Sequence, residues 1–372
     1  MKHIGKSYDK VDAKGILSGK PSYTGDFVPK DALIIKVLRS PHAQAKIKSI
    51  DTSKAKLIPG VEAIFTYEDV PNTRFTLAGQ TYPEPSAYDA LILDPVVRYV
   101  GDEVALVVAK DEATALKAMP LIKVEYEVQK PVLDLRTAMD HETVVHPEDD
   151  ILNHIPVGQD YKRNICVSYH KRVGDIEGEL AKCDYVVEGT YFDQATRQSA
   201  MEPFQSFGYI DHLGRIVIVS STQIVFHVRR HIARALGIPA SKIRVIKPRI
   251  GGGFGSKQTA CTELMTAFVT WKLQKPCYLL YDRTEAQTCS TTRHAREWYI
   301  RVGATKDGII QVIDMDSITD AGAHATHCFT TTTAGEHKSV PLYNKAKAVH
   351  YGTEGVYMNH TPGGAFRGYG AT

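Results

Sequence analysis

The chain has 372 residues, of which 43% are hydrophobic and 23% are charged, as is usual for a globular protein. Its 45 Lys and Arg residues against 42 Asp and Glu residues give a net charge of +3, too small an excess to indicate nucleic-acid binding. The N-terminal segment is too polar for a secretory signal, and no stretch reaches the roughly 20 apolar residues of a membrane span. We therefore expect a cytoplasmic protein that binds neither nucleic acid nor a membrane.

Residues 1–130 are expected to form a small α/β unit. The strands predicted from apolar alternation and clustering are 32–38, 61–65, 97–109 (one long strand or a pair) and 122–126. A short Ala-rich helix is predicted over 111–118, because Asp111 is a good capping residue. Residues 131–165 are rich in Asp, His and Pro and lose this periodicity, which indicates a linker between two domains.

Residues 166–372 are expected to form a second unit, of the α+β class. Its predicted strands are 185–192, 206–210, 215–220 and 243–246, with a hairpin over 296–319. Helices are predicted over 223–236, which ends at Gly237, and over 259–273. The densest basic run of the chain, residues 227–231 with Arg234, lies on the first of these helices, and we interpret it as a solvated helix face.

The spacing of the six cysteines does not indicate a metal site. None of the six belongs to a C-x-x-C pair, so cysteine-bound zinc and iron–sulfur centres are not expected. In a reducing cytoplasm these thiols should stay free.

The most glycine-rich motif, Gly251-Gly252-Gly253-Phe254-Gly255-Ser256-Lys257-Gln258, lies between a predicted strand and a predicted helix. Its glycines leave backbone N–H groups uncovered, and at a helix N-terminus such a loop suits an anion or the polar edge of a cofactor. It is not a phosphate-binding P-loop, because Ser256 precedes Lys257 and Gln258 follows it. A dinucleotide-binding fingerprint also fits poorly, and a simple tight turn is an equal alternative.

Three further motifs allow both a structural and a functional interpretation. In Ser220-Ser221-Thr222-Gln223, a helix cap accounts for Thr222 but not for Gln223. Met201-Glu202-Pro203 places an acid before a proline, which a simple turn explains. The second glycine-rich loop is Pro362-Gly363-Gly364-Ala365-Phe366-Arg367-Gly368-Tyr369-Gly370. Its Arg367 can bind an anion through two N–H groups or can be an ordinary surface arginine.

In order and spacing, these motifs resemble the molybdenum-binding subunit of the xanthine dehydrogenase and aldehyde oxidase family, in its bacterial split-subunit form. The matching segments of the first unit are 39–43, 58–61, 78–80 and 97–102. Those of the second unit are 201–203, 221–223, 251–258, 292–294, 320–323 and 365–368. The resemblance implies an α+β fold, with a small hammerhead-like α/β domain followed by the first molybdopterin-binding domain, truncated at its C-terminal end.

The resemblance also implies that a pterin dithiolene holds the molybdenum, without a direct protein ligand. Protein groups then orient the cofactor, which is molybdopterin or its cytosine dinucleotide form. By this resemblance, Gln223 hydrogen-bonds the cofactor's apical oxygen, and Arg367 lies beside the metal. Both are candidate catalytic residues. The backbone of Gly252, Gly253, Phe254 and Gly255 is expected to lie against the cofactor.

The implied reaction is hydroxylation of an electron-poor C–H group with water as the oxygen source. The loop ends in Lys257-Gln258, as in bacterial split-subunit purine dehydrogenases, whereas animal-type enzymes have a glutamate at the second position. We therefore expect Gln258 to contact a purine such as xanthine or hypoxanthine, with other N-heterocycles or aldehydes left open. Lys338 lies near the place of a purine-clamping arginine and is a second candidate substrate contact.

The resemblance further implies partners. The family's general base is a glutamate that falls beyond Thr372, and neither Glu202 nor Glu263 is a candidate for that role. FAD and 2Fe-2S motifs are absent from the sequence, so a FAD subunit and a 2Fe-2S subunit are expected as partners. A separate chain carrying the C-terminal molybdenum domain would complete the site. Two hypotheses stay open: an enzyme subunit completed in this way, or a truncated, non-catalytic remnant.

Overall fold

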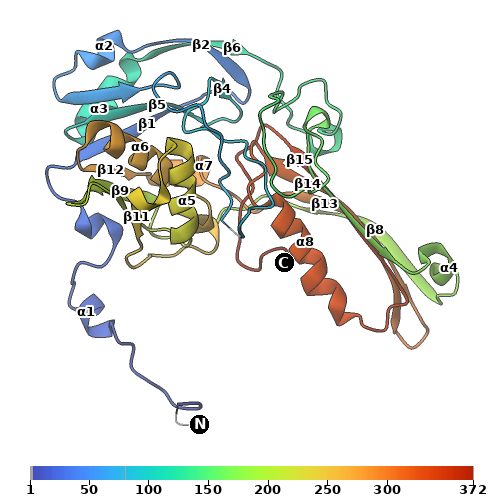
Figure 1. Ribbon diagram of the computed structural model, residues 1–372. Coiled ribbons are helices and arrows are strands. Elements are labelled where there is room, and N and C mark those ends of the chain that lie inside the picture. Colours follow the sequence, from blue (N-terminus) through green and yellow to red (C-terminus); the bar gives the residue numbers. More distant parts are fainter. Residues whose placement is uncertain (1–2, 80, 372) are drawn as a thin grey trace.

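The computed structural model describes residues 3–79 and 81–371 and arranges them around three β-sheets (Figure 1). Gln80, part of one family-like motif, lies outside the described residues, as do Met1, Lys2 and Thr372. The strands of the largest sheet are, in spatial order, β11 (Ile243–Ile246), β10 (Ile216–Ser220), β9 (Gln205–Ile210), β12 (Cys277–Leu280), β1 (Leu33–Arg39), β5 (Glu103–Ala109) and β3 (Val61–Phe65). No helix in the described ranges is long and apolar enough to cross a bilayer.

This seven-stranded sheet is continuous between the two predicted units. Strand β1 pairs in parallel with β12, with Leu33 opposite Cys277, and it pairs antiparallel with β5 on its other edge. Strand β5 is an almost unbroken apolar run because both of its faces are covered. Leu106 faces the core under the long helices, whereas Val107 faces helix α3 (Glu112–Ala118).

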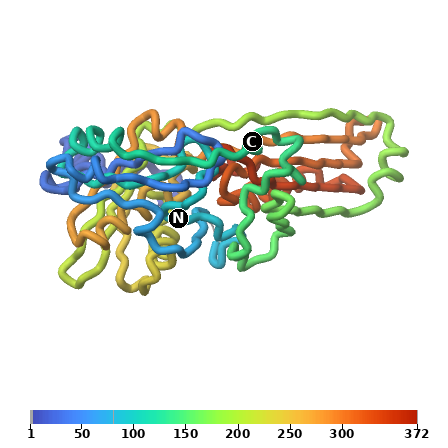
Figure 2. The backbone as a smooth tube through the Cα atoms, turned by 90° about the horizontal axis from the view of Figure 1, so that it is seen from above, coloured from blue at the N-terminus to red at the C-terminus, as the bar shows by residue number. Residues whose placement is uncertain are grey.

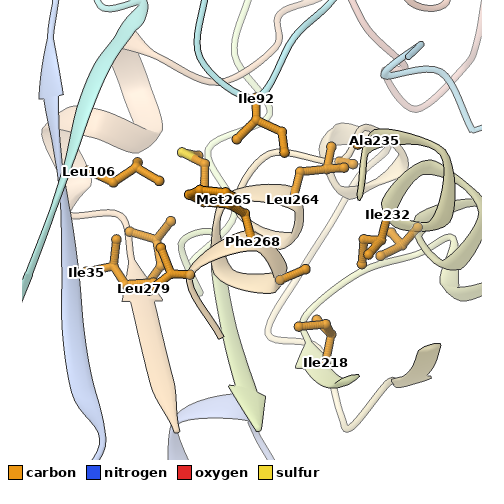
Figure 3. Close-up of a cluster of buried hydrophobic side chains, with 14 of the residues drawn as sticks. Ile35, Ile92, Leu106, Ile218, Ile232, Ala235, Leu264, Met265, Phe268 and Leu279 are labelled. Atoms are coloured by element: carbon orange, nitrogen blue, oxygen red, sulfur yellow. The ribbon is translucent and has the colours of Figure 1, made fainter. Parts of the chain in front are cut away.

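The main hydrophobic core joins residues that are distant in sequence (Figure 3). Ile35 of β1 packs in one cluster with Ile232 of α5 (Val225–Leu236) and Phe268 of α6 (Glu263–Leu273). Helix α6 begins at Glu263 and not at 259 as predicted, since the Glu263 carboxylate accepts the N–H groups of Cys261 and Thr262. A separate 3-10 turn, Ser256–Gln258, intervenes, so the glycine-rich loop does not lead directly into α6.

The second sheet has five strands and extends away from the rest of the molecule (Figure 2). Its strands are, in order, β7 (Ile165–Val173), β15 (Ala348–Tyr357), β14 (Ile310–Gly322), β13 (Arg296–Ala304) and β8 (Tyr185–Asp193). Strands β13 and β14 form the predicted hairpin. Helix α8 (Cys328–Ser339) packs against this sheet, and α4 (Ile176–Leu180) covers its far end.

A third, three-stranded sheet and three short helices are also present among the described residues. The third sheet is β4 (Val96–Val97), β2 (Ala45–Asp51) and β6 (Lys123–Val128), and the short helices are α1 (Ala13–Leu17), α2 (Ser53–Lys56) and α7 (Arg283–Thr288). In the predicted linker, Val132, Ala138 and Val145 are fully buried and share a core cluster with the five-stranded sheet. All six cysteines are free thiols.

Candidate functional site

The glycine-rich loop leaves β11 and folds tightly against Gln223. Gly252 and Gly255 have φ values of +103° and +99°, in the region that favours glycine. A Cβ atom on Gly253 would lie 2.5 Å from Gln223 Oε1, so only glycine leaves room for the glutamine there. The position of Gln223 thus requires a glycine at 253, whereas Gly252 and Gly255 are required by their backbone conformation.

Gln223 is held at the junction of β10 and α5. Its backbone N–H donates to Lys257 O at 2.8 Å, and its Oε1 accepts from the Gly255 N–H at 3.2 Å. Its Nε2 group makes no hydrogen bond to any residue that the structure describes. Thr222 Oγ1 accepts from the Ile224 N–H at 3.1 Å, in the turn before α5. The predicted cap at Thr222 is wrong, because α5 begins at Val225 and its N-cap residue is Ile224, without a side-chain cap hydrogen bond. The amide N–H donors of Gln223 are therefore available to a ligand.

The second glycine-rich loop contacts the first. The Arg367 N–H donates to Phe254 O at 2.9 Å, and a Cβ atom on Gly255 would lie 2.6 Å from Ala365 O. Gln198 Nε2 donates to the same Ala365 carbonyl at 2.7 Å. Two loops more than a hundred residues apart therefore form one rigid surface beside Gln223.

An open cavity of about 560 Å³ lies at this junction. It is lined by Gln223, Phe254, Gly255, Gln258, Lys338, Ala365, Phe366, Arg367, Gly368 and Tyr369. Lys338 Nζ donates to Tyr369 O at 2.7 Å, and the exposed Arg367 side chain forms no ion pair within the described ranges. Because these lining residues include no Asp or Glu, the wall suits a group with exposed oxygens and negative charge.

The structure thus brings together most of the residues that the sequence singled out. Gln223, Gln258, Lys338 and Arg367 all face one cavity, with Phe254 and Gly255 on its wall. Gly252 and Gly253 lie behind this wall, where a Cβ on Gly252 would meet Ala200 at 3.3 Å.

Two acids near the site, the partly buried Glu202 and the buried Glu263, make structural contacts. Glu202 Oε2 accepts from the Gly251 N–H at 2.6 Å and from Lys257 Nζ at 2.8 Å, so it anchors both ends of the loop. Burial lowers the pKa of Lys257, although Glu202 opposes this shift. The carboxylate of Glu263 accepts from Ser220 Oγ at 2.6 Å, and burial raises the pKa of Glu263. Neither carboxylate lines the cavity.

The basic run on α5 is not a solvated face, contrary to our interpretation of the sequence. His231 is only 3% exposed, and the guanidinium of Arg234 lies 4.4 Å from the ring centre of Tyr88. Glu84, which the sequence analysis did not consider, faces both His227 and His231. The signal that was missed is the spacing of the two histidines, because residues four apart lie on one side of a helix.

Comparison with known proteins gives matches over nearly the whole chain. The model of the molybdopterin cofactor-binding domain matches residues 157–372, and that of the aldehyde oxidase and xanthine dehydrogenase a/b hammerhead domain matches residues 18–130. The probable hypoxanthine oxidase XdhD of Escherichia coli (strain K12) is 38% identical over 99% of this chain but 41% of its own length. This chain therefore spans less than half of that relative.

Two further matches differ in how much of the relative they cover. The nicotinate dehydrogenase large molybdopterin subunit of Eubacterium barkeri is 31% identical over 99% of this chain and 82% of its own length. The structure of the aldehyde oxidoreductase from Desulfovibrio gigas superposes with a TM-score of 0.87 at 26% identity, over 98% of this chain and 40% of that one.

Proposed function

Because the chain belongs to the aldehyde oxidase and xanthine dehydrogenase family, we propose that it carries part of the molybdenum-cofactor site of a hydroxylase. The observation that carries this proposal is the wall on which Gln223, Phe254 and Arg367 meet. Its uncommitted N–H donors fit a cofactor that presents oxygens and negative charge. Gly253 leaves room for the Gln223 side chain against the loop, which keeps that amide at the cavity wall.

Each residue then has a definite task. Gln223 donates from Nε2 to an acceptor oxygen of the cofactor, while its Oε1 stays on the Gly255 N–H. The Arg367 guanidinium stabilises negative charge at the cavity mouth. When bound, the molybdenum cofactor supplies the two-electron oxidation chemistry. These residues would hold and orient it, and no Asp or Glu of the described residues lines the cavity to accept a proton.

We propose a purine, xanthine or hypoxanthine, as the substrate. Gln258 and Lys338 line the same cavity as Gln223. The relative XdhD is named a probable hypoxanthine oxidase. A side-chain amide both donates and accepts hydrogen bonds, as the edge of a neutral purine requires. An aldehyde or another N-heterocycle is the second candidate, supported by the names of the Desulfovibrio gigas and Eubacterium barkeri proteins.

We also propose the assembly in which the chain works. Residues 1–130 would form the hammerhead-like domain, 131–165 a linker and 166–372 the cofactor domain, a division supported by the two family matches. Partner subunits would carry FAD and 2Fe-2S clusters, and a separate chain would supply the C-terminal molybdenum domain. The name of the Eubacterium barkeri relative, a large molybdopterin subunit, supports an assembly of several subunits. The pterin is proposed to be molybdopterin or its cytosine dinucleotide form.

The test compares the isolated chain with the chain produced together with these partner subunits. We expect molybdenum and xanthine or hypoxanthine oxidation in the complex, and no turnover by the isolated chain, since loss of a general base alone costs about 10²- to 10⁴-fold. Gln223→Leu and Arg367→Met should reduce both molybdenum content and turnover in the complex. Turnover by the isolated chain would refute the missing base, and a complex without molybdenum would refute the cofactor site.

A further inference from the structure

A cluster of two histidines and a glutamate lies away from the cofactor cavity. His227 and His231 are one turn apart on α5 and face Glu84, which lies in the segment after Gln80. Glu84 Oε1 is 3.5 Å from His227 Nδ1 and 3.7 Å from His231 Nε2. Candidate ligand atoms of the three residues all lie within 4.8 Å of one another.

These distances fit a shared cation better than a hydrogen-bonded triad. They exceed the 2.7–3.2 Å of ordinary N–H···O hydrogen bonds. With zinc–ligand bonds of about 2.0–2.2 Å, neighbouring ligands of a tetrahedral ion lie roughly 3.3–3.5 Å apart. The two carboxylate–imidazole distances need to contract by only a few tenths of an ångström to reach that geometry, and the nitrogens of the two histidines lie within 4.8 Å of each other.

A second observation concerns the buried ring of His231. Neither of its nitrogens has a hydrogen-bond partner in the described part of the chain, although side-chain polar atoms at such depth are normally paired.

We propose that Glu84, His227 and His231 form a binding site for a divalent transition-metal ion, with zinc the best match. Two imidazoles and one carboxylate are a set that zinc takes, with a fourth position left for water. Two histidines four residues apart on a helix are a spacing found in zinc sites. Tyr88 donates its hydroxyl to Glu84 Oε2 at 2.8 Å and so orients the carboxylate from outside the site.

Arg230 competes with the metal for this position. Its Nη2 lies 3.1 Å from Glu84 Oε1 and 2.7 Å from His227 Nδ1, so the guanidinium supplies the positive charge when no metal is bound. The Arg230 side chain is 31% exposed and stacks on the exposed ring of Tyr82. A metal ion can therefore displace it outward into solvent.

The site would tie the helix that follows Gln223 to the segment of the first unit that contains Glu84. None of its three residues lines the cavity beside Gln223, so the metal site is separate from the proposed cofactor site. It would act as a clamp between two segments that are far apart in sequence.

The experiment is a calorimetric titration of zinc chloride into the full chain after removal of metals with a chelator. We expect one zinc ion per chain, with Glu84→Gln and His231→Gln each weakening binding by at least about tenfold. His212→Gln, at an exposed histidine outside the cluster, should bind as the native chain does. Arg230→Gln keeps all three ligands and removes the competing cation, so it should bind zinc roughly threefold more tightly or better.

The Arg230 variant decides the outcome if either ligand variant fails to fold. Tighter zinc binding by Arg230→Gln supports the site, and equal or weaker binding overturns it. Undetectable binding by the native chain, or native affinity in a folded His231→Gln or Glu84→Gln chain, also overturns it.

Discussion

Lys257 Nζ lies 2.8 Å from Glu202 Oε2, and the two side chains are only 2% and 10% exposed. The same Glu202 oxygen accepts the Gly251 N–H, so one carboxylate fixes the beginning and the end of the glycine-rich loop. The backbone carbonyl of Lys257 in turn accepts a hydrogen bond from the Gln223 N–H. The position of Gln223, which we propose hydrogen-bonds the cofactor, therefore depends on the ion pair between Lys257 and Glu202.

Removing one partner of this pair should be strongly destabilising, because it leaves a buried charge without compensation. We expect Lys257→Met to lower the free energy of unfolding by about 3–5 kcal/mol, measured by urea denaturation. Lys182→Met removes the lysine of an exposed pair with Glu179 and should cost about 0–1 kcal/mol. The double variant Lys257→Met/Glu202→Gln should lose less than the sum of the single changes. Similar losses for Lys257→Met and Lys182→Met would contradict this account.

Gly253→Ala tests the contact between the loop and Gln223. The new methyl group would lie 2.5 Å from Gln223 Oε1, so the side chain must move and its bond to the Gly255 N–H is lost. In the assembled enzyme we expect a roughly three- to tenfold fall in turnover, the worth of one hydrogen bond. Gly15→Ala, where the nearest atom is 3.7 Å away, is the matched control. A fall in turnover of the same size in both variants would show that the contact does not matter.

Gln258→Glu tests the substrate side of the cavity. An amide and a carboxylate have the same size but differ in charge and in donor capacity, worth about 1–3 kcal/mol at a buried hydrogen bond. We expect the ratio of kcat/KM for different purines to change by roughly 5- to 150-fold, with molybdenum content unchanged. Gln287→Glu, outside the cavity, should leave both unchanged. Loss of molybdenum with an unaltered substrate preference would argue against a substrate contact.

The pair of His360 and Asp320 predicts a dependence of stability on pH. His360 Nδ1 lies 2.7 Å from Asp320 Oδ2, and this hydrogen bond raises the pKa of His360. The stabilisation is complete below the unfolded pKa of about 6.5 and is lost as pH rises through the higher folded pKa. His360→Asn should therefore lower the free energy of unfolding, measured by urea denaturation, more at pH 5.5 than at pH 9, by less than about 1 kcal/mol because the side chain is partly exposed. An equal effect at both pH values would mean that the imidazolium contributes nothing.

Local patterns in the sequence predicted most strands but missed β2, β7, β12 and β15, and they did not predict every helix. Strands β3 and β11 match their predicted ranges because each is mostly β-branched and apolar, with a single charged residue at its second position. Helix α8 was not predicted, since its run of threonines has no apolar periodicity. It is helical because Thr331, Thr332 and Thr333 are buried by packing around the helix.

For the site, too, the sequence predicted individual residues but not how the fold brings them together. Gln223, Phe254 and Arg367 came from the resemblance to a family, and their meeting at one cavity is a long-range property that no local pattern contains. The His227 and His231 spacing was visible in the sequence, but their partner Glu84 lies in another unit and only the fold brings it close. Charge alone favoured a solvated face because it carries no information about burial.

The parallel pairing of β1 with β12 has a consequence for how the chain is made. Leu33 leaves the ribosome early, whereas its partner Cys277 follows roughly 10–50 s later at ordinary rates of synthesis. During that interval one edge of β1 is without its neighbour, and such edges invite pairing with other chains. Lys36 lies within this strand and is buried beside Glu112 and Glu285 in the folded chain. Before β12 is made, its charge would disfavour pairing of β1 with strands of other chains.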